Sequence, residues 1–222
     1  MAFEEYARAQ RDGLREVHAL ESKNENPYLI VLDELLPEIN SMSRVSLGVQ
    51  TISTSNIAGT ATQGRSTAFS RSFKPLLAAG TEFAAKWDNL HDSVLRDGLR
   101  DPIKVLEYYN KYYVIEGNKR VSVSRQMDMI TMEADVTRVL PVKDDSPRWH
   151  AYQAYLRFHA DTGLDMPVFQ TPAGYEELHT LSGFPEGIRW DTVDVANLRT
   201  AFLNFTNSYK TCAGNRPEPM PK

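Results

Sequence analysis

The chain has 222 residues, 41% of them hydrophobic and 24% charged, with a formal net charge of −4. This length allows one large domain, or one medium domain with an appendage. The acidic balance argues against a protein that coats nucleic acid over its whole surface. A single cysteine, Cys212, excludes both a disulfide framework and a cysteine metal site.

The N-terminal sequence is charged and amphipathic and has no apolar signal-peptide core. No apolar run approaches the length of a membrane-spanning helix, so we expect a cytoplasmic protein. The five histidines are scattered without metal-binding spacing, and we therefore predict no histidine metal site. They are His18, His91, His150, His159 and His179.

The first 44 residues are predicted to form an N-terminal helical segment. Apolar periodicity predicts a surface helix over residues 3–21. Residues 26–39 form a short apolar segment, predicted to be partly helical. Residues 45–53 have the composition of a β-strand.

The next part of the chain lacks acidic residues. There is no Asp or Glu between Ile39 and Thr81, and the stretch is rich in Ser, Thr, Gly and Asn. One interpretation is a solvated loop. The other is a loop that offers hydroxyls, backbone N–H groups and guanidinium groups to an anion. The cations in this stretch are Arg44, Arg65, Arg71 and Lys74.

A regular pattern of helices and strands follows. A helix is predicted over 81–98, with Thr81 as its N-cap and Gly98 as its C-terminal stop. Strands at 101–108 and 111–116 are close enough to form a β-hairpin. A helix then begins at residue 118, and another strand covers 132–141. Tyrosines 108, 109, 112 and 113 could stack on a base or, as we favour, pack across the sheet.

Residues 144–210 are predicted to be helical, and the proline-rich tail 211–222 to be disordered. Ser146 is placed to cap the first of these helices, with Pro147 at its first position. Pro167 and Pro172 interrupt any recognition helix, so direct sequence-specific DNA binding by this region is not expected. We expect these C-terminal helices to contact a protein partner.

The junction between residues 112 and 126 is the most informative part of the sequence. "YYVIEGNKRVSVSRQ" runs from a strand into a helix with almost no loop. The first turn of a helix has unpaired N–H groups and a positive partial charge, so an anion gains several hydrogen bonds there. Gly117 permits close approach, Lys119 and Arg120 add charge, and Glu116 could bind Mg²⁺ or accept a proton. The alternative is a glycine strand exit followed by a charged helix start.

Three segments in order resemble the ParB/sulfiredoxin-like family. They are "GTATQGRSTAF" (59–69), "GLRDPIKV" (98–105) and "YYVIEGNKR" (112–120). The resemblance covers roughly residues 45–142, so we expect an α+β fold there. Such a domain has a small mixed sheet with packed helices, flanked here by the N-terminal helix and the C-terminal helical extension.

In that family, the G-x-x-R turn and an upstream arginine bind nucleotide phosphates. The resemblance therefore implies phosphate binding by Arg65, Gly117, Asn118, Lys119 and Arg120. Asn118 replaces the family's glutamate, which puts nucleotide hydrolysis in doubt. It also replaces the catalytic cysteine of sulfiredoxins, which argues against their activity.

Three functions remain open at the level of sequence. The preferred one is a regulatory module that binds a nucleotide such as CTP or ATP, or another phosphorylated molecule, and could associate with DNA through partners. The second is a Mg²⁺-dependent phosphotransferase in which Glu116 is the base or metal ligand. The third is an interaction scaffold without a ligand.

Overall fold

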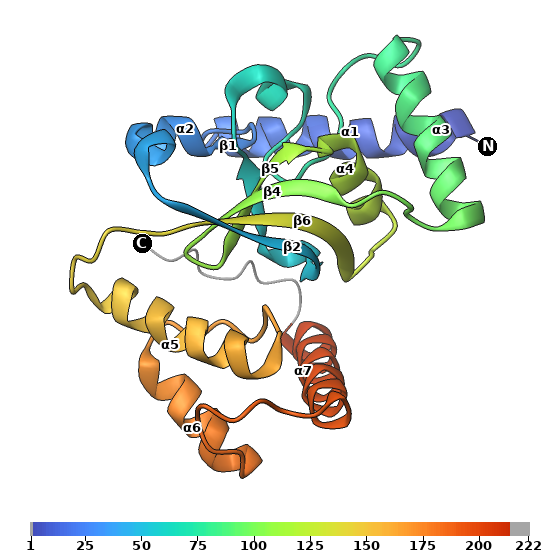
Figure 1. Ribbon diagram of the computed structural model, residues 1–222. Helices are drawn as coiled ribbons and strands as arrows, with labels where there is room; N and C mark the ends of the chain where they lie inside the picture. The colour runs from blue at the N-terminus through green and yellow to red at the C-terminus, as the bar shows by residue number, and fades with distance from the viewer. Residues whose placement is uncertain (1, 214–222) are drawn as a thin grey trace. The chain divides into compact units, whose positions relative to one another are not determined.

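The computed structural model describes residues 2–213, with side chains described for 4–209. The chain divides into two compact units, Met1–Lys143 and Asp144–Lys222 (Figure 1). The predicted N-terminal segment 1–44 lies within the first unit. Of the predicted tail, residues 211–213 end the last helix, and the remainder lies outside the described residues.

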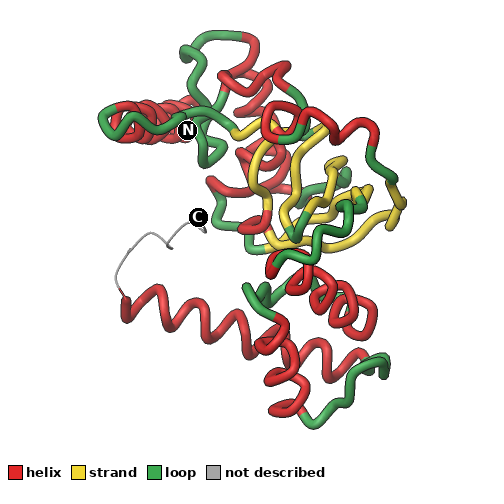
Figure 2. The backbone as a smooth tube through the Cα atoms, turned by 90° about the vertical axis from the view of Figure 1, so that its left-hand side faces the viewer, coloured by secondary structure: helices red, strands yellow, loops and turns green. Residues whose placement is uncertain are grey.

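The first unit contains a six-stranded mixed sheet in the order β1-β3-β5-β4-β6-β2. Figure 2 shows these strands side by side in a twisted sheet. β3 is parallel to β1 and β5, β4 is antiparallel to β5 and parallel to β6, and β2 is antiparallel to β6. The strands are β1 (Ile30–Val31), β2 (Arg44–Ser53), β3 (Ile57–Thr60), β4 (Ile103–Tyr108), β5 (Lys111–Glu116) and β6 (Thr131–Val139).

Helices complete the first unit. The α-helices are α1 (Ala2–Glu21), α2 (Leu32–Leu35), α3 (Glu82–Asp97) and α4 (Asn118–Gln126), and the 3-10 helices are η1 (Pro37–Ser41), η2 (Thr54–Asn56) and η3 (Gln63–Ala68). α3 begins and ends as predicted, since Thr81 Oγ1 accepts the Ala84 amide at 3.2 Å and Gly98 has a φ of 74°. The predicted α+β class is therefore confirmed.

Side chains alternate between two buried clusters because successive strand residues point to opposite faces of a sheet. Val105, Tyr112 and Val114 face the larger cluster, to which α1, α3 and α4 contribute. Leu106 and Tyr113 face the smaller cluster, which includes residues of α2 and η1. Tyr112 and Tyr113 are both buried, and this favours the packing interpretation of the tyrosines over base stacking.

The acid-free stretch between residues 39 and 81 is not a solvated loop. It contains β3, which lies inside the sheet between β1 and β5, and the buried aromatic residues Phe69 and Phe73. Carboxylates from elsewhere hold it in place: Glu16 of α1 accepts hydrogen bonds from Ser70 Oγ at 2.7 Å and from the Ser72 amide at 2.9 Å.

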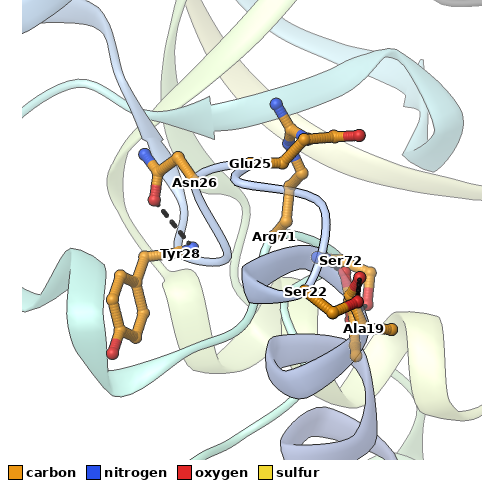
Figure 3. Close-up of polar contacts among 8 residues, drawn as sticks. Ala19, Ser22, Glu25, Asn26, Tyr28, Arg71 and Ser72 are labelled. Carbon is orange, nitrogen blue, oxygen red and sulfur yellow. Dashed lines mark hydrogen bonds and ion pairs between the residues drawn. The ribbon is translucent and has the colours of Figure 1, made fainter.

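A second clamp on this stretch lies just beyond α1, where Arg71 Nη1 lies 2.8 Å from Glu25 Oε2 (Figure 3). In the same turn, Asn26 Oδ1 accepts the Tyr28 amide at 3.0 Å (Figure 3). The N-terminal segment thus supplies the carboxylates that pair with this acid-free stretch. Arg71 and the Ser72 amide are therefore already paired within the chain.

Arg125, at the C-terminal end of α4, joins that helix to the beginning of β3. Its Nη2 donates to the carbonyl oxygens of Thr54 at 2.9 Å and Ile57 at 2.6 Å. The guanidinium also lies 4.9 Å from the ring centre of Phe73. Burial lowers the pKa of Arg125 to about 10, which leaves it charged at neutral pH.

The second unit is helical, as its composition predicts. Its helices are α5 (Pro147–Thr162), α6 (Pro172–Ser182) and α7 (Thr192–Ala213). Ser146 caps α5, since its Oγ accepts the Trp149 amide at 3.1 Å, and Pro147 follows at the first helical position. None of the helices within residues 2–213 has both the length and the apolar character that crossing a membrane requires.

We expect Arg125→Met to destabilise the first unit by about 2–4 kcal/mol, because two carbonyl groups would lose a charged donor in a largely buried place. Urea unfolding monitored by circular dichroism measures this change. The control is Arg96→Met, since Arg96 is exposed on α3 and its loss should stay within about 0.5 kcal/mol. Equal losses of stability in the two variants would contradict a stabilising role for the hydrogen bonds of Arg125 to Thr54 and Ile57.

Candidate functional site

The junction between β5 and α4 consists of a single residue, Gly117. Its φ of 115° lies in the left-handed region, which glycine adopts without strain. A Cβ at this position would lie only 2.5 Å from Ile103 Cγ2, the side chain against which the turn packs. Gly117 is therefore required both by its backbone conformation and by its neighbour.

Gly117 also leaves the beginning of α4 without a side-chain cap. The first N–H groups of a helix have no partner within the helix, and a Ser, Thr or Asp cap would normally satisfy one of them. The positive end of the helix dipole is therefore available to an external acceptor.

Arg120 is engaged by the chain itself. Its Nη1 donates to the carbonyl oxygens of Asp101 at 2.9 Å and Pro102 at 2.7 Å, which fixes the segment that leads into β4. Glu116 lies 3.4 Å from Arg120 Nη2 and 3.2 Å from Lys104 Nζ. The structure thus places Arg120 and Glu116 in one group with Lys104.

Lys119 belongs to a second group of charged residues, together with Arg65 and Lys86. The pKa of Lys119 is lowered by partial burial and then by the positive charges of Arg65 and Lys86. Its ammonium lies 4.4 Å from the ring centre of Phe83. We call Arg65, Lys86 and Lys119 the cation cluster.

The cation cluster combines three elements that are distant in sequence: η3, α3 and α4. Glu82 lies beside the cluster and pairs with Lys86 at 2.5 Å. The pKa of Glu82 is lowered by this hydrogen bond and by the charge of Lys86, with smaller effects from Lys119 and Arg65. Three cations therefore face one carboxylate that is already paired.

Arg65 is the most available member of the cluster. Arg65 itself interrupts η3, because its backbone has a non-helical φ of −139° and ψ of 27°. Its side chain is exposed. Within the described part of the chain, it forms neither a hydrogen bond nor an ion pair. Its guanidinium retains the two-pronged geometry that suits phosphate oxygens.

Asn118, the first residue of α4, adds an acceptor. Its Nδ2 lies 3.4 Å from Thr60 Oγ1, and the Thr60 hydroxyl donates to the Val114 carbonyl at 3.0 Å. Asn118 Oδ1 is buried and has no hydrogen-bond partner among the described residues. A ligand with a hydroxyl or amino group would supply the missing donor.

The structure divides the six predicted site residues. It brings Arg65 and Lys119 together near the turn at Gly117 and Asn118, whereas Arg120 and Glu116 interact with the β4 side. Lys86 was not predicted as a site residue. Its pairing with Glu82 was visible as an i, i+4 spacing on a predicted helix, but its proximity to Arg65 depends on tertiary structure.

No family model and no curated protein matches the chain. Among solved structures, sulfiredoxin from Arabidopsis thaliana matches with 18% sequence identity and a TM-score of 0.29, covering 40% of this chain and 82% of that one. The α+β assignment therefore rests on the sheet and helices described above.

Replacing Gly117 should strongly destabilise the first unit. We expect Gly117→Ala to cost about 2–5 kcal/mol, since a left-handed conformation and a collision with Ile103 add together. Gly48→Ala is the control: its φ is 69°, but an added Cβ meets nothing within 4 Å, so strain alone should cost about 1 kcal/mol. Chemical denaturation compares the two, and equal losses would contradict the packing argument.

Proposed function

We propose that the first unit binds a phosphorylated small molecule, with a nucleotide as the preferred class, at the beginning of α4. The observation that carries this proposal is the cation cluster beside an uncapped helix N-terminus. Partial burial and then the positive charges of Arg65 and Lys86 lower the pKa of Lys119, so the charged form of Lys119 is disfavoured there. An anion between these cations would favour the charged form and accept hydrogen bonds from the helix amides.

The unpartnered oxygen of Asn118 favours a nucleotide over a bare phosphate. Phosphate at neutral pH mainly accepts hydrogen bonds, whereas a buried amide oxygen requires a donor. A nucleotide carries phosphates together with ribose hydroxyls and, in CTP and ATP, an exocyclic amino group. The resemblance of residues 112–120 to a nucleotide-binding turn supports the same class.

A regulatory binding role is preferred over phosphotransfer. Glu116, the residue that could act as a base or metal ligand, is paired with Lys104 and Arg120. Among the residues that the structure describes, no three His, Cys, Asp or Glu side chains form a group that could hold a metal. We propose that Mg²⁺ would be bound mainly by the ligand's own phosphates.

The C-terminal helices are the proposed partner-binding part of this regulatory module. On α7, Phe205 and Tyr209 are 66% and 63% exposed, and their ring centres lie 6.1 Å apart. Exposed aromatic side chains of this kind are enriched in protein interfaces. Association with DNA through such a partner is part of the same proposal.

A thermal-shift panel tests ligand binding. We expect at least one of CTP, ATP, GTP and ADP, with or without Mg²⁺, to raise the melting temperature of the chain, because a ligand that binds only the folded state stabilises it. Arg65→Gln should abolish most of that shift, whereas the exposed Arg96→Gln should preserve it. No shift with any nucleotide would favour the scaffold alternative, and product analysis of the same mixtures would reveal phosphotransfer.

Lys119→Met separates binding from stability. Without ligand, we expect the variant to melt about 1–2 °C higher, because a partly buried charge and its repulsion from Arg65 and Lys86 are removed, while the methionine sulfur can replace the ammonium against the Phe83 ring. With nucleotide, the variant should lose most of the stabilisation that the unmodified chain gains. Differential scanning calorimetry measures both, with Lys104→Met as the control. A lower melting temperature without ligand would contradict the repulsion.

A further inference from the structure

A small hollow in the second unit is the strongest feature that the proposed function does not use. It has a volume of about 220 Å³ and lies beside the first two turns of α7 and the segment before it. Its lining includes Arg189, Trp190, Thr192, Val195, Ala196 and Arg199. Thr192, Val195, Ala196 and Arg199 share one face of α7 because they are spaced at i, i+3, i+4 and i+7.

Two of the residues that line this hollow are arginines. Neither Arg189 nor Arg199 forms a hydrogen bond or an ion pair with the residues that the structure describes. By contrast, Arg157 in the same unit forms an ion pair with Glu186. Both arginines that line the hollow are therefore without a direct ion-pair partner among the described side chains.

The indole of Trp190 is a third unsatisfied donor. Trp190 is only 6% exposed, and its ring packs 4.4 Å from the ring of Phe184. Its Nε1–H is buried without a hydrogen-bond acceptor among the described residues. Buried indole N–H groups normally have an acceptor, and Trp190 is among the residues that line the hollow.

Two aspartates near the hollow limit the negative charge that a ligand bound there can carry. Asp191 Oδ1 accepts the amides of Val193 and Asp194, both at 2.8 Å, and so caps α7. The pKa of Asp194 is raised by desolvation and by the charge of Asp191. This nearby negative charge disfavours a phosphate dianion more than a carboxylate, which carries one charge.

We propose that this hollow binds a small organic carboxylate. Arg189 and Arg199 would bind the carboxylate oxygens, Trp190 Nε1 would donate to one of them, and Val195 and Ala196 would contact the apolar part of the ligand. The volume is below the range of about 300–1,000 Å³ that is typical of drug-sized ligands, so the ligand has to be small. This site lies in a different compact unit from the nucleotide site proposed above and does not depend on it.

The test is a titration of the ¹⁵N-labelled full chain, followed through the indole N–H signals of its three tryptophans. Trp190→Phe assigns the signal of Trp190. We expect benzoate to shift that signal saturably, and the neutral isostere benzamide to leave it unchanged. Arg189→Gln and Arg199→Gln should each weaken benzoate binding about tenfold, since each removes a charge-assisted hydrogen bond. Arg157→Gln should preserve it.

Several results would overturn the proposal. Benzamide binding as tightly as benzoate would remove the role of charge, and unchanged affinity in both arginine variants would place the carboxylate elsewhere. Inorganic phosphate binding more tightly than benzoate at the same signal would replace the carboxylate by a phosphate. The absence of any saturable shift with benzoate would remove the site.

Discussion

The left-handed turn at Gly117 is the constraint on which the site depends. With a φ of 115° and Ile103 Cγ2 only 2.5 Å from where a Cβ would be, the position accepts glycine alone without rearrangement. The turn lets β5 pass directly into α4 and leaves the first amides of that helix without a side-chain cap. Packing in the core of the first unit and the availability of the helix N-terminus thus have the same cause.

The charges around this turn have two distinct roles. Arg120 donates to two carbonyl oxygens of the segment before β4, and its role is to stabilise the fold. Arg65, Lys86 and Lys119 do not stabilise one another: partial burial and then the charges of Arg65 and Lys86 lower the pKa of Lys119. Unfavourable charge proximity is common at functional sites, where a ligand compensates for it.

Much of the fold could be predicted from local sequence signals. The caps Thr81 and Ser146, the stop at Gly98 and the hairpin between β4 and β5 depend on neighbouring residues alone, and the structure confirms them. β3 was missed because only four residues, Ile57–Thr60, form it. Its place in the sheet comes from pairing with β1 and β5, which the local sequence does not encode.

The site was harder to predict for the same reason. The glycine turn and its neighbouring cations could be read from one short segment, but the sequence could not show which cations would turn toward the chain's own carbonyls. The partners of Arg120 precede it by 18 and 19 residues. Lys86 approaches Lys119 only because α3 and α4 pack on the same face of the sheet.

The most direct measurement is an amide ¹H–¹⁵N NMR titration of the full chain with pyrophosphate and then with the nucleotides. We predict that the largest saturable shifts occur at the backbone amides of Asn118 and Lys119 and at the side-chain N–H signal of Arg65. Shifts that are absent there, or that spread over exposed lysines and arginines without saturating, would contradict an anion site at the beginning of α4.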